Sequence, residues 1–197
     1  MLNELMPLIV GFLLSTVLGG LLGFYFQNRS WKHQNNAKVL EAELHTALNV
    51  FEDVSKLMDK RLYRMRLLFW RLSSDQYDQD VIENYMELYR EVLHEWNDNL
   101  NRNLALIQCY FGSSIRKQID YEIYKQFRDI GKSLEEAYLA RKSGHAPSDL
   151  KLLEHDIEVL SHINYRFNIR VINLIQHRQV GIFNSDKEDS ATPVRIK

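Results

Sequence analysis

The sequence predicts an all-α protein in which one N-terminal transmembrane helix is followed by a cytoplasmic up-down four-helix bundle. An uncharged run of 20 residues, 7–26, lies near the start of the chain. Apolar residues then recur at steps of three and four along four long segments, which is typical of helices with one buried face. Helix breakers are scarce, with 3 prolines and 8 glycines in 197 residues, and four of those glycines lie in the apolar run.

The apolar run is expected to be a membrane anchor. A helix of this length covers about 30 Å, the thickness of the hydrocarbon core of a bilayer. A cleaved signal peptide would instead carry positive charge before the run and a small-residue cleavage site after it. The preceding stretch, MLNELM, contains Glu4 and no Lys or Arg, and the following stretch is aromatic and basic. We therefore expect an uncleaved anchor over residues 1–28, in contact with the lipid bilayer.

Basic residues flank the run on one side only. Arg29, Lys32 and Lys38 follow it, and none precedes it. The positive-inside rule then predicts an N-terminus outside the cell and a body in the cytoplasm. No second apolar run of comparable length occurs, so we expect a single-pass protein of a bacterial-type inner (plasma) membrane.

Small residues follow a regular spacing within the run. Gly11, Ser15, Gly19 and Gly23 lie four residues apart. Each step of four advances the helix by about 40°, so the four residues fall within one stripe about 120° wide. Helices in lipid associate by close packing at small residues. We expect this stripe to be the oligomerisation face of a homo-oligomer, with Ser15 and Thr16 as candidate pore-lining residues.

The body, residues 29–178, is expected to contain four helical segments. Their approximate bounds are 31–72, 81–111, 115–141 and 150–178. The first can continue from the anchor, since no strong breaker separates them. Its apolar stripe consists of Leu40, Leu44, Leu48, Phe51, Val54, Met58, Leu62, Met65, Phe69 and Leu72. Short connections between such segments favour antiparallel neighbours.

Caps and breakers separate the segments. Asp80 is expected to cap the second helix, because its carboxylate can accept from free backbone amides. Gly112 can close the second segment in a left-handed conformation, with a following serine as the next cap. Gly144 is expected to stop the third segment. Periodicity is lost at the end of the chain, so residues 179–197 are expected to form a flexible tail.

Composition and motifs argue against several chemistries. The formal net charge is −1 and the pI about 6.7, so no global positive field attracts nucleic acid. Cys109 is the only cysteine, which excludes a disulfide framework and a thiolate metal cluster. Glu91 and His94 lack the second Glu-x-x-His of a two-metal bundle, and His155 with His162 supplies only two ligands. We expect no metal and no small-molecule cofactor.

One basic stretch, KRLYRMRLLFWR, holds Lys60, Arg61, Arg64, Arg66 and Arg71 among aromatic residues. Such a mixture can bind RNA or acidic lipid. Its leucines, methionine and phenylalanine continue the apolar stripe of the first segment. We therefore expect the solvated basic edge of a packed helix, facing the acidic start of the second segment.

Arg170 and His177 are the candidate catalytic residues. The stretch RVINLIQH places them on one helix face about two turns apart. An arginine can hold a phosphate and a histidine can move a proton, so the pair could cleave a phosphodiester. In the structural alternative, Arg170 extends along the edge of the core and His177 caps the helix C-terminus.

An Arg-x6-His near the end of a helical bundle, here Arg170 and His177, resembles the HEPN superfamily of prokaryotic nucleases and RNA-binding domains. Val171 stands where HEPN proteins commonly carry a polar residue. With its single N-terminal span, the chain is similar to the membrane accessory proteins of type VI CRISPR systems. The resemblance implies ring assembly, a membrane pore, antiviral defence and an RNA or RNA-guided partner.

Three functions stay open at this point. The first is a self-assembling membrane protein that forms a pore or perturbs the membrane in antiviral defence. The second is a membrane-tethered HEPN-like ribonuclease that uses Arg170 and His177. The third is a non-enzymatic membrane adaptor or sensor.

Overall fold

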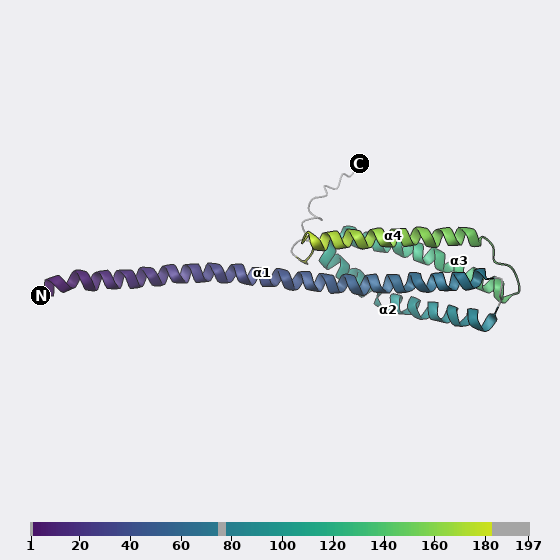
Figure 1. The fold of residues 1–197 in the computed structure, drawn as a ribbon, viewed down its shortest axis with the longest axis horizontal. Coiled ribbons are helices and arrows are strands. Elements are labelled where there is room, and N and C mark those ends of the chain that lie inside the picture. Colours follow the sequence, from purple (N-terminus) through teal and green to yellow (C-terminus); the bar gives the residue numbers. More distant parts are fainter. Residues whose placement is uncertain (1, 75–77, 183–197) are drawn as a thin grey trace, which may run out of the picture. The chain divides into compact units, whose positions relative to one another are not determined.

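The computed structural model describes residues 2–74 and 78–182, and it confirms the all-α class. Within these residues the regular elements are helices, with no strand. The helices are α1 (Leu2–Ser73), α2 (Gln79–Lys117), the π-helix η1 (Gln118–Ile123), α3 (Tyr124–Lys142) and α4 (Leu150–Gln176) (Figure 1). The chain divides into two compact units, Met1–Ala42 and Glu43–Lys197.

Helix α1 covers both the expected anchor and the first expected bundle segment. It continues through residue 28, where we placed the end of the anchor. The boundary between the two compact units also falls inside α1, after Ala42. Residues 26–38, FQNRSWKHQNNAK, link the apolar run to the bundle part of α1 and contain no proline or glycine. No residue there therefore interrupts the backbone hydrogen bonds of the helix.

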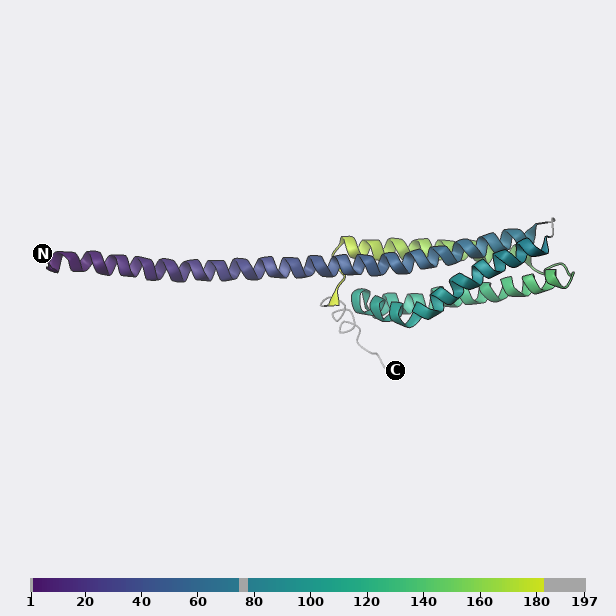
Figure 2. The ribbon, with the colours of Figure 1, turned by 90° about the horizontal axis from the view of Figure 1, so that it is seen from below.

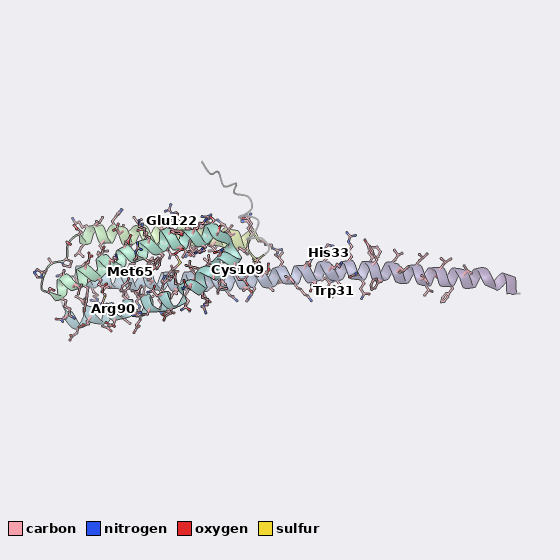
Figure 3. All side chains as sticks on the ribbon, turned by 180° about the vertical axis from the view of Figure 1, so that it is seen from behind. Trp31, His33, Met65, Arg90, Cys109 and Glu122 are labelled. Carbon is pink, nitrogen blue, oxygen red and sulfur yellow. The ribbon has the colours of Figure 1, made fainter. Side chains whose placement is uncertain are left out.

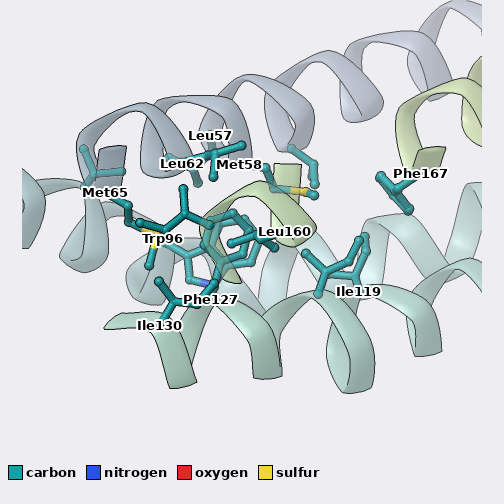
Figure 4. Close-up of a cluster of buried hydrophobic side chains, with 14 of the residues drawn as sticks. Leu57, Met58, Leu62, Met65, Trp96, Ile119, Phe127, Ile130, Leu160 and Phe167 are labelled. Atoms are coloured by element: carbon teal, nitrogen blue, oxygen red, sulfur yellow. The ribbon is translucent and has the colours of Figure 1, made fainter. Parts of the chain in front are cut away.

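The second unit is a helical bundle whose helices share one hydrophobic core (Figure 4). The largest fully buried apolar side chains are Met58, Met65, Leu68 and Leu72 of α1, Met86, Trp96, Ile107 and Ile115 of α2, Ile119 of η1, Phe127 of α3 and Phe167 of α4. Full burial of one such side chain contributes about 1.5–3 kcal/mol. The other three segments also repeat apolar residues at steps of three and four, and those residues lie in or against this core, as Val92, Ile130 and Ile157 do.

Helix α4 runs beside the part of α1 that belongs to the second unit, in both views of the ribbon (Figures 1 and 2). Asn164 of α4 donates to Oδ1 of Asp59 at 2.7 Å, and Ser55 donates to Oδ1 of Asn168 at 3.2 Å. At the N-terminal end of the predicted stripe on α1, Leu40 and Leu48 are 37% and 38% exposed, whereas Leu44 is partly buried and packs against the core. In α1 the buried positions begin at Ala47.

Helix α2 breaks at Gly112, as expected, but no loop follows. Gly112 has φ 82° and ψ 172°, a conformation that only glycine adopts readily, and helical structure resumes directly after it. The chain then enters η1, which the sequence analysis missed. There the Tyr124 N–H donates to the carbonyl of Ile119, five residues earlier, which is the bond that defines a π-helix.

The helix caps agree with the sequence in part. The prediction of Asp80 as the N-cap of α2 is wrong, because Asp78 occupies that position and its Oδ1 accepts from the Val81 N–H at 3.2 Å. Asp80 instead lies in the first turn of the helix. Gly144 confirms its expected role as a stop, since it follows α3 with φ 77°.

The first residues of the expected flexible tail, 179–182, lie against the bundle. Val180 is buried, with 2% of its surface exposed, and the Gly181 N–H donates to the carbonyl of Tyr110 at 2.9 Å. Residues 179–182 are therefore held against the bundle, because an apolar side chain and a backbone amide there both have partners. The rest of the expected tail, 183–197, lies outside the described residues.

Candidate functional site

Arg170 lies on the exposed face of α4, beside an open groove of about 580 Å³ between α4, η1 and the start of α3. Its Nη1 donates to Oε1 of Gln118 at 3.0 Å, and its Nη2 donates to Oγ of Ser114 at 3.1 Å. These bonds tie α4 to the end of α2 and the start of η1. The charged residues that line the groove are Glu122, Lys125, Arg166 and Arg170. The groove therefore carries more positive than negative charge.

His177 ends α4 and belongs to the helix terminus. Its Nδ1 lies 2.7 Å from the carbonyl oxygen of Asn173. Because a carbonyl can only accept, Nδ1 carries the proton in this bond. His177 does not line the groove beside Arg170. Among the described residues no hydrogen bond joins Arg170 to His177, and each of the two side chains has its own hydrogen-bond partners.

The other histidines and the cysteine do not form a metal centre. Across residues 2–74 and 78–182, no group of three or more His, Cys, Asp or Glu side chains has a metal-binding arrangement. Cys109 is a free, half-buried thiol in the second half of α2 (Figure 3). No catalytic base is hydrogen-bonded to it in the part of the chain that the structure describes.

The first unit presents an apolar helix surface. Near its N-terminus α1 is long and apolar enough to cross a membrane, and none of that stretch is buried. A side chain placed at Gly11, Gly19, Gly20 or Gly23 would meet nothing within 4 Å. These four glycines therefore serve no packing purpose within the protomer.

The two hydroxyl residues of the small-residue stripe bond to their own helix. Ser15 and Thr16 both donate to the carbonyl oxygen of Phe12, at 3.0 and 2.8 Å. Such bonds satisfy a hydroxyl in a helix without any outside partner. Both side chains can therefore face an apolar environment, and the role of Ser15 and Thr16 as pore-lining residues stays a prediction.

The basic stretch of α1 is a solvated edge at several positions. Lys60 pairs with Glu95 of α2 at 2.6 Å, and both side chains are about half exposed. The Arg71 guanidinium lies over the ring of Tyr85, 5.2 Å from its centroid. The expected charge match between α1 and α2 is therefore present at one ion pair, whereas Glu83 of α2 pairs with Lys142 of α3 and Glu87 pairs with Arg90 of its own helix.

Arg61 contradicts that expectation. Only 1% of its surface is exposed, although we expected it on the solvated basic edge. Arg61 lies three residues after Met58 and four before Met65, so helix periodicity places it on the buried stripe. That spacing was the signal available in the sequence, and the positive charge of the residue obscured it.

Comparison with known proteins gives no family assignment. No protein-family model, no curated protein and no solved structure matches this chain.

Proposed function

We propose that the protein is a single-pass membrane protein whose N-terminal helix anchors a cytoplasmic up-down four-helix bundle and brings copies of the chain together. The apolar stretch of α1 supports the anchor, because the large apolar side chains described along it are 50–71% exposed within one chain. Lipid is the environment that such a surface requires. The basic residues after the stretch support a cytoplasmic position of the bundle by the positive-inside rule, and we propose a bacterial-type inner (plasma) membrane.

The glycines of the span are the observation that carries self-assembly. Glycine is less favourable than alanine inside a helix by roughly 0.5–1 kcal/mol. Here no neighbouring atom in the protomer lies where the side chains of Gly19 or Gly23 would be. A second helix that packs closely against this face would make use of the missing side chains, as small residues do at helix contacts in membranes.

The type of assembly follows from the resemblance to the membrane accessory proteins of type VI CRISPR systems. On that basis we propose a ring of spans that encloses a pore or perturbs the membrane during antiviral defence. Ser15 and Thr16 lie on or beside the small-residue stripe, so they are the proposed polar lining. An RNA or RNA-guided defence protein is the proposed partner.

The experiment compares oligomeric mass between two span variants and the wild type. Native mass spectrometry of the full chain in mild detergent should give a homo-oligomer for the wild type. The Gly19→Leu/Gly23→Leu variant should give a smaller species, because leucine fits the protomer but separates two packed helices. Val17→Leu, on the opposite face, should leave the mass unchanged. An unchanged mass in the double variant would contradict the proposed role of these glycines.

A membrane-tethered HEPN-like ribonuclease is the second candidate. The position of Arg170 on a cationic groove favours it, whereas the separate partners of Arg170 and His177 do not. The test is RNA cleavage by the wild type and by the Arg170→Ala, His177→Ala and Arg102→Ala variants; Arg102 is exposed on α2 and does not line the groove. Cleavage that is lost in the first two and kept in the third would establish the nuclease. Cleavage that all three variants keep would exclude these residues as its site.

A further inference from the structure

Arg61 is a buried cation without a carboxylate partner. Its Nη2 donates to the carbonyl of Phe127 over a long 3.4 Å, while Nε and Nη1 are buried with no hydrogen-bond partner. The guanidinium lies over the Phe127 ring at 4.7 Å and near the Trp96 ring at 5.9 Å. Among the described residues no ion pair reaches it, and burial lowers the pKa of Arg61. Buried charges in proteins are normally paired.

Arg61 lines a cavity of about 260 Å³ between α1, α2 and α3. The charged residues in its lining are Arg61, Arg90, Arg128, Lys132 and Glu135. Arg90 pairs with Glu135 at 3.6 Å and with Glu87 at 2.9 Å, and Arg128 pairs with Asp129 at 3.2 Å. Among the described residues no carboxylate pairs with Arg61 or Lys132, so these two cations leave the cavity with an excess of positive charge.

Neutral hydrogen-bonding groups complete the cavity. Tyr89 and Asn97 of α2 line it, together with Tyr124 of α3. Gly131 also lines it and allows the Tyr89 hydroxyl to come close to the α3 backbone. The neighbouring Trp96 has a buried Nε1 donor without an acceptor. This part of the core thus holds more donors than acceptors, which favours a guest that supplies acceptor oxygens.

We propose that this cavity binds a small oxyanion, a phosphate group either free or carried by a phosphate ester, with Arg61 as its buried anchor. A phosphate oxygen accepts from a guanidinium in charge-assisted bonds, which are stronger than neutral ones. The volume lies below the roughly 300–1,000 Å³ of sites that enclose drug-sized ligands, so it suits one such group. Arg128 and Lys132 are exposed and would form the entrance. This site is independent of the Arg170 groove and of assembly through the span.

The test is thermal unfolding of the full chain in detergent with increasing inorganic phosphate or adenosine monophosphate. Sodium chloride at equal ionic strength is the control. At 100 times its Kd, a ligand of the folded state should raise the unfolding midpoint by roughly 5–10 °C. A higher unfolding midpoint with inorganic phosphate indicates that the free anion is the ligand. A higher midpoint with adenosine monophosphate alone indicates that the ligand is a phosphate ester. No rise beyond the chloride control with either probe would overturn the proposal.

Two arginine variants locate the effect. Arg61→Met keeps the apolar stem and removes the charge, so the midpoint without ligand should stay equal or rise, and the response to phosphate should disappear. Arg66→Met removes one charge from the same helix outside the cavity and should respond as the wild type does. An equal response in Arg61→Met would place the anion elsewhere and overturn the proposal.

Two variants at the entrance of the cavity, Arg128→Ala and Lys132→Ala, test the proposal even if Arg61→Met does not fold. Arg128→Ala and Lys132→Ala replace exposed residues and should leave the fold intact. Combined, they should raise the phosphate concentration needed for half of the stabilisation at least about tenfold, as loss of charge-assisted bonds predicts. An unchanged concentration dependence would contradict binding in this cavity.

Discussion

Replacing Gly131 by alanine should destabilise the bundle, although alanine is the better helix former. Gly131 lies on α3 where α3 faces Tyr89 of α2. A Cβ atom at Gly131 would overlap the Tyr89 hydroxyl oxygen. Tyr89 is only 3% exposed, so its ring is held by the core around it. The next nearest atoms, Cζ of Tyr89 at 3.7 Å and Cε of Met65 at 4.0 Å, are at ordinary contact distance.

Two opposing effects determine how much Gly131→Ala changes the free energy of unfolding. Alanine gains about 0.8–1.0 kcal/mol over glycine in helix propensity. Overpacking costs about 1–3 kcal/mol, and a tyrosine ring held by its neighbours favours the upper part of that range. We expect Gly131→Ala to lower the free energy of unfolding by about 1–2 kcal/mol, which lowers the melting midpoint by about 2–8 °C.

Removing the Tyr89 hydroxyl should make Gly131→Ala stabilising rather than destabilising. In a Tyr89→Phe background the overlapping oxygen is gone, so Gly131→Ala should stabilise the protein by up to about 1 kcal/mol. Urea unfolding of the full chain in detergent, measured for the wild type, both single variants and the double variant, gives the coupling energy. An equal effect of Gly131→Ala in both backgrounds would show that the contact with Tyr89 does not decide the cost.

The helix cap and one ion pair give two further predictions. Asp78→Ala should lower the free energy of unfolding by about 1 kcal/mol because it removes the side-chain bond to Val81, whereas Asp80→Ala should change it less; urea unfolding of both variants checks this. The hydrogen bond from Lys142 lowers the pKa of Glu83 below its ordinary value of 4.5. The ionised Glu83 carboxylate therefore stabilises the folded protein above pH 4.5, and this stabilisation is lost as the pH falls through the lowered pKa. The stability difference between wild type and Glu83→Gln should therefore shrink in acid, and a difference that grows would contradict this sign.

The fold class could be predicted because burial follows the helical period. Each stripe on α2, α3 and α4 repeats an apolar residue every three or four positions, and the packed core requires that repeat. Gly112 and Gly144 were predictable for a local reason, since both adopt a positive φ that glycine favours. These features depend on residues near one another in sequence.

Other features depend on contacts that the sequence does not display. The bonds from Arg170 to Gln118 and Ser114 join residues that are 52 and 56 positions apart in the sequence. The π-helix η1 does not interrupt the apolar stripe, because Ile119 and Ile123 within it are both buried. The burial of Arg61 depends on Phe127 and Trp96 covering it from two other helices. The charge of Arg61 favoured a position on the surface, whereas its place on the apolar stripe indicated a position in the core.

The central claim is that copies of the chain meet through the small-residue face of the span. Since Cys109 is the only cysteine, a Cys109→Ser background allows single cysteines to be placed in α1. Gly19→Cys lies on that face, and Leu21→Cys lies about 200° around the helix from it. Oxidation in intact membranes should give disulfide-linked dimers for Gly19→Cys and few for Leu21→Cys. Absence of dimers at Gly19→Cys, or equal yields at both positions, would contradict assembly through this face.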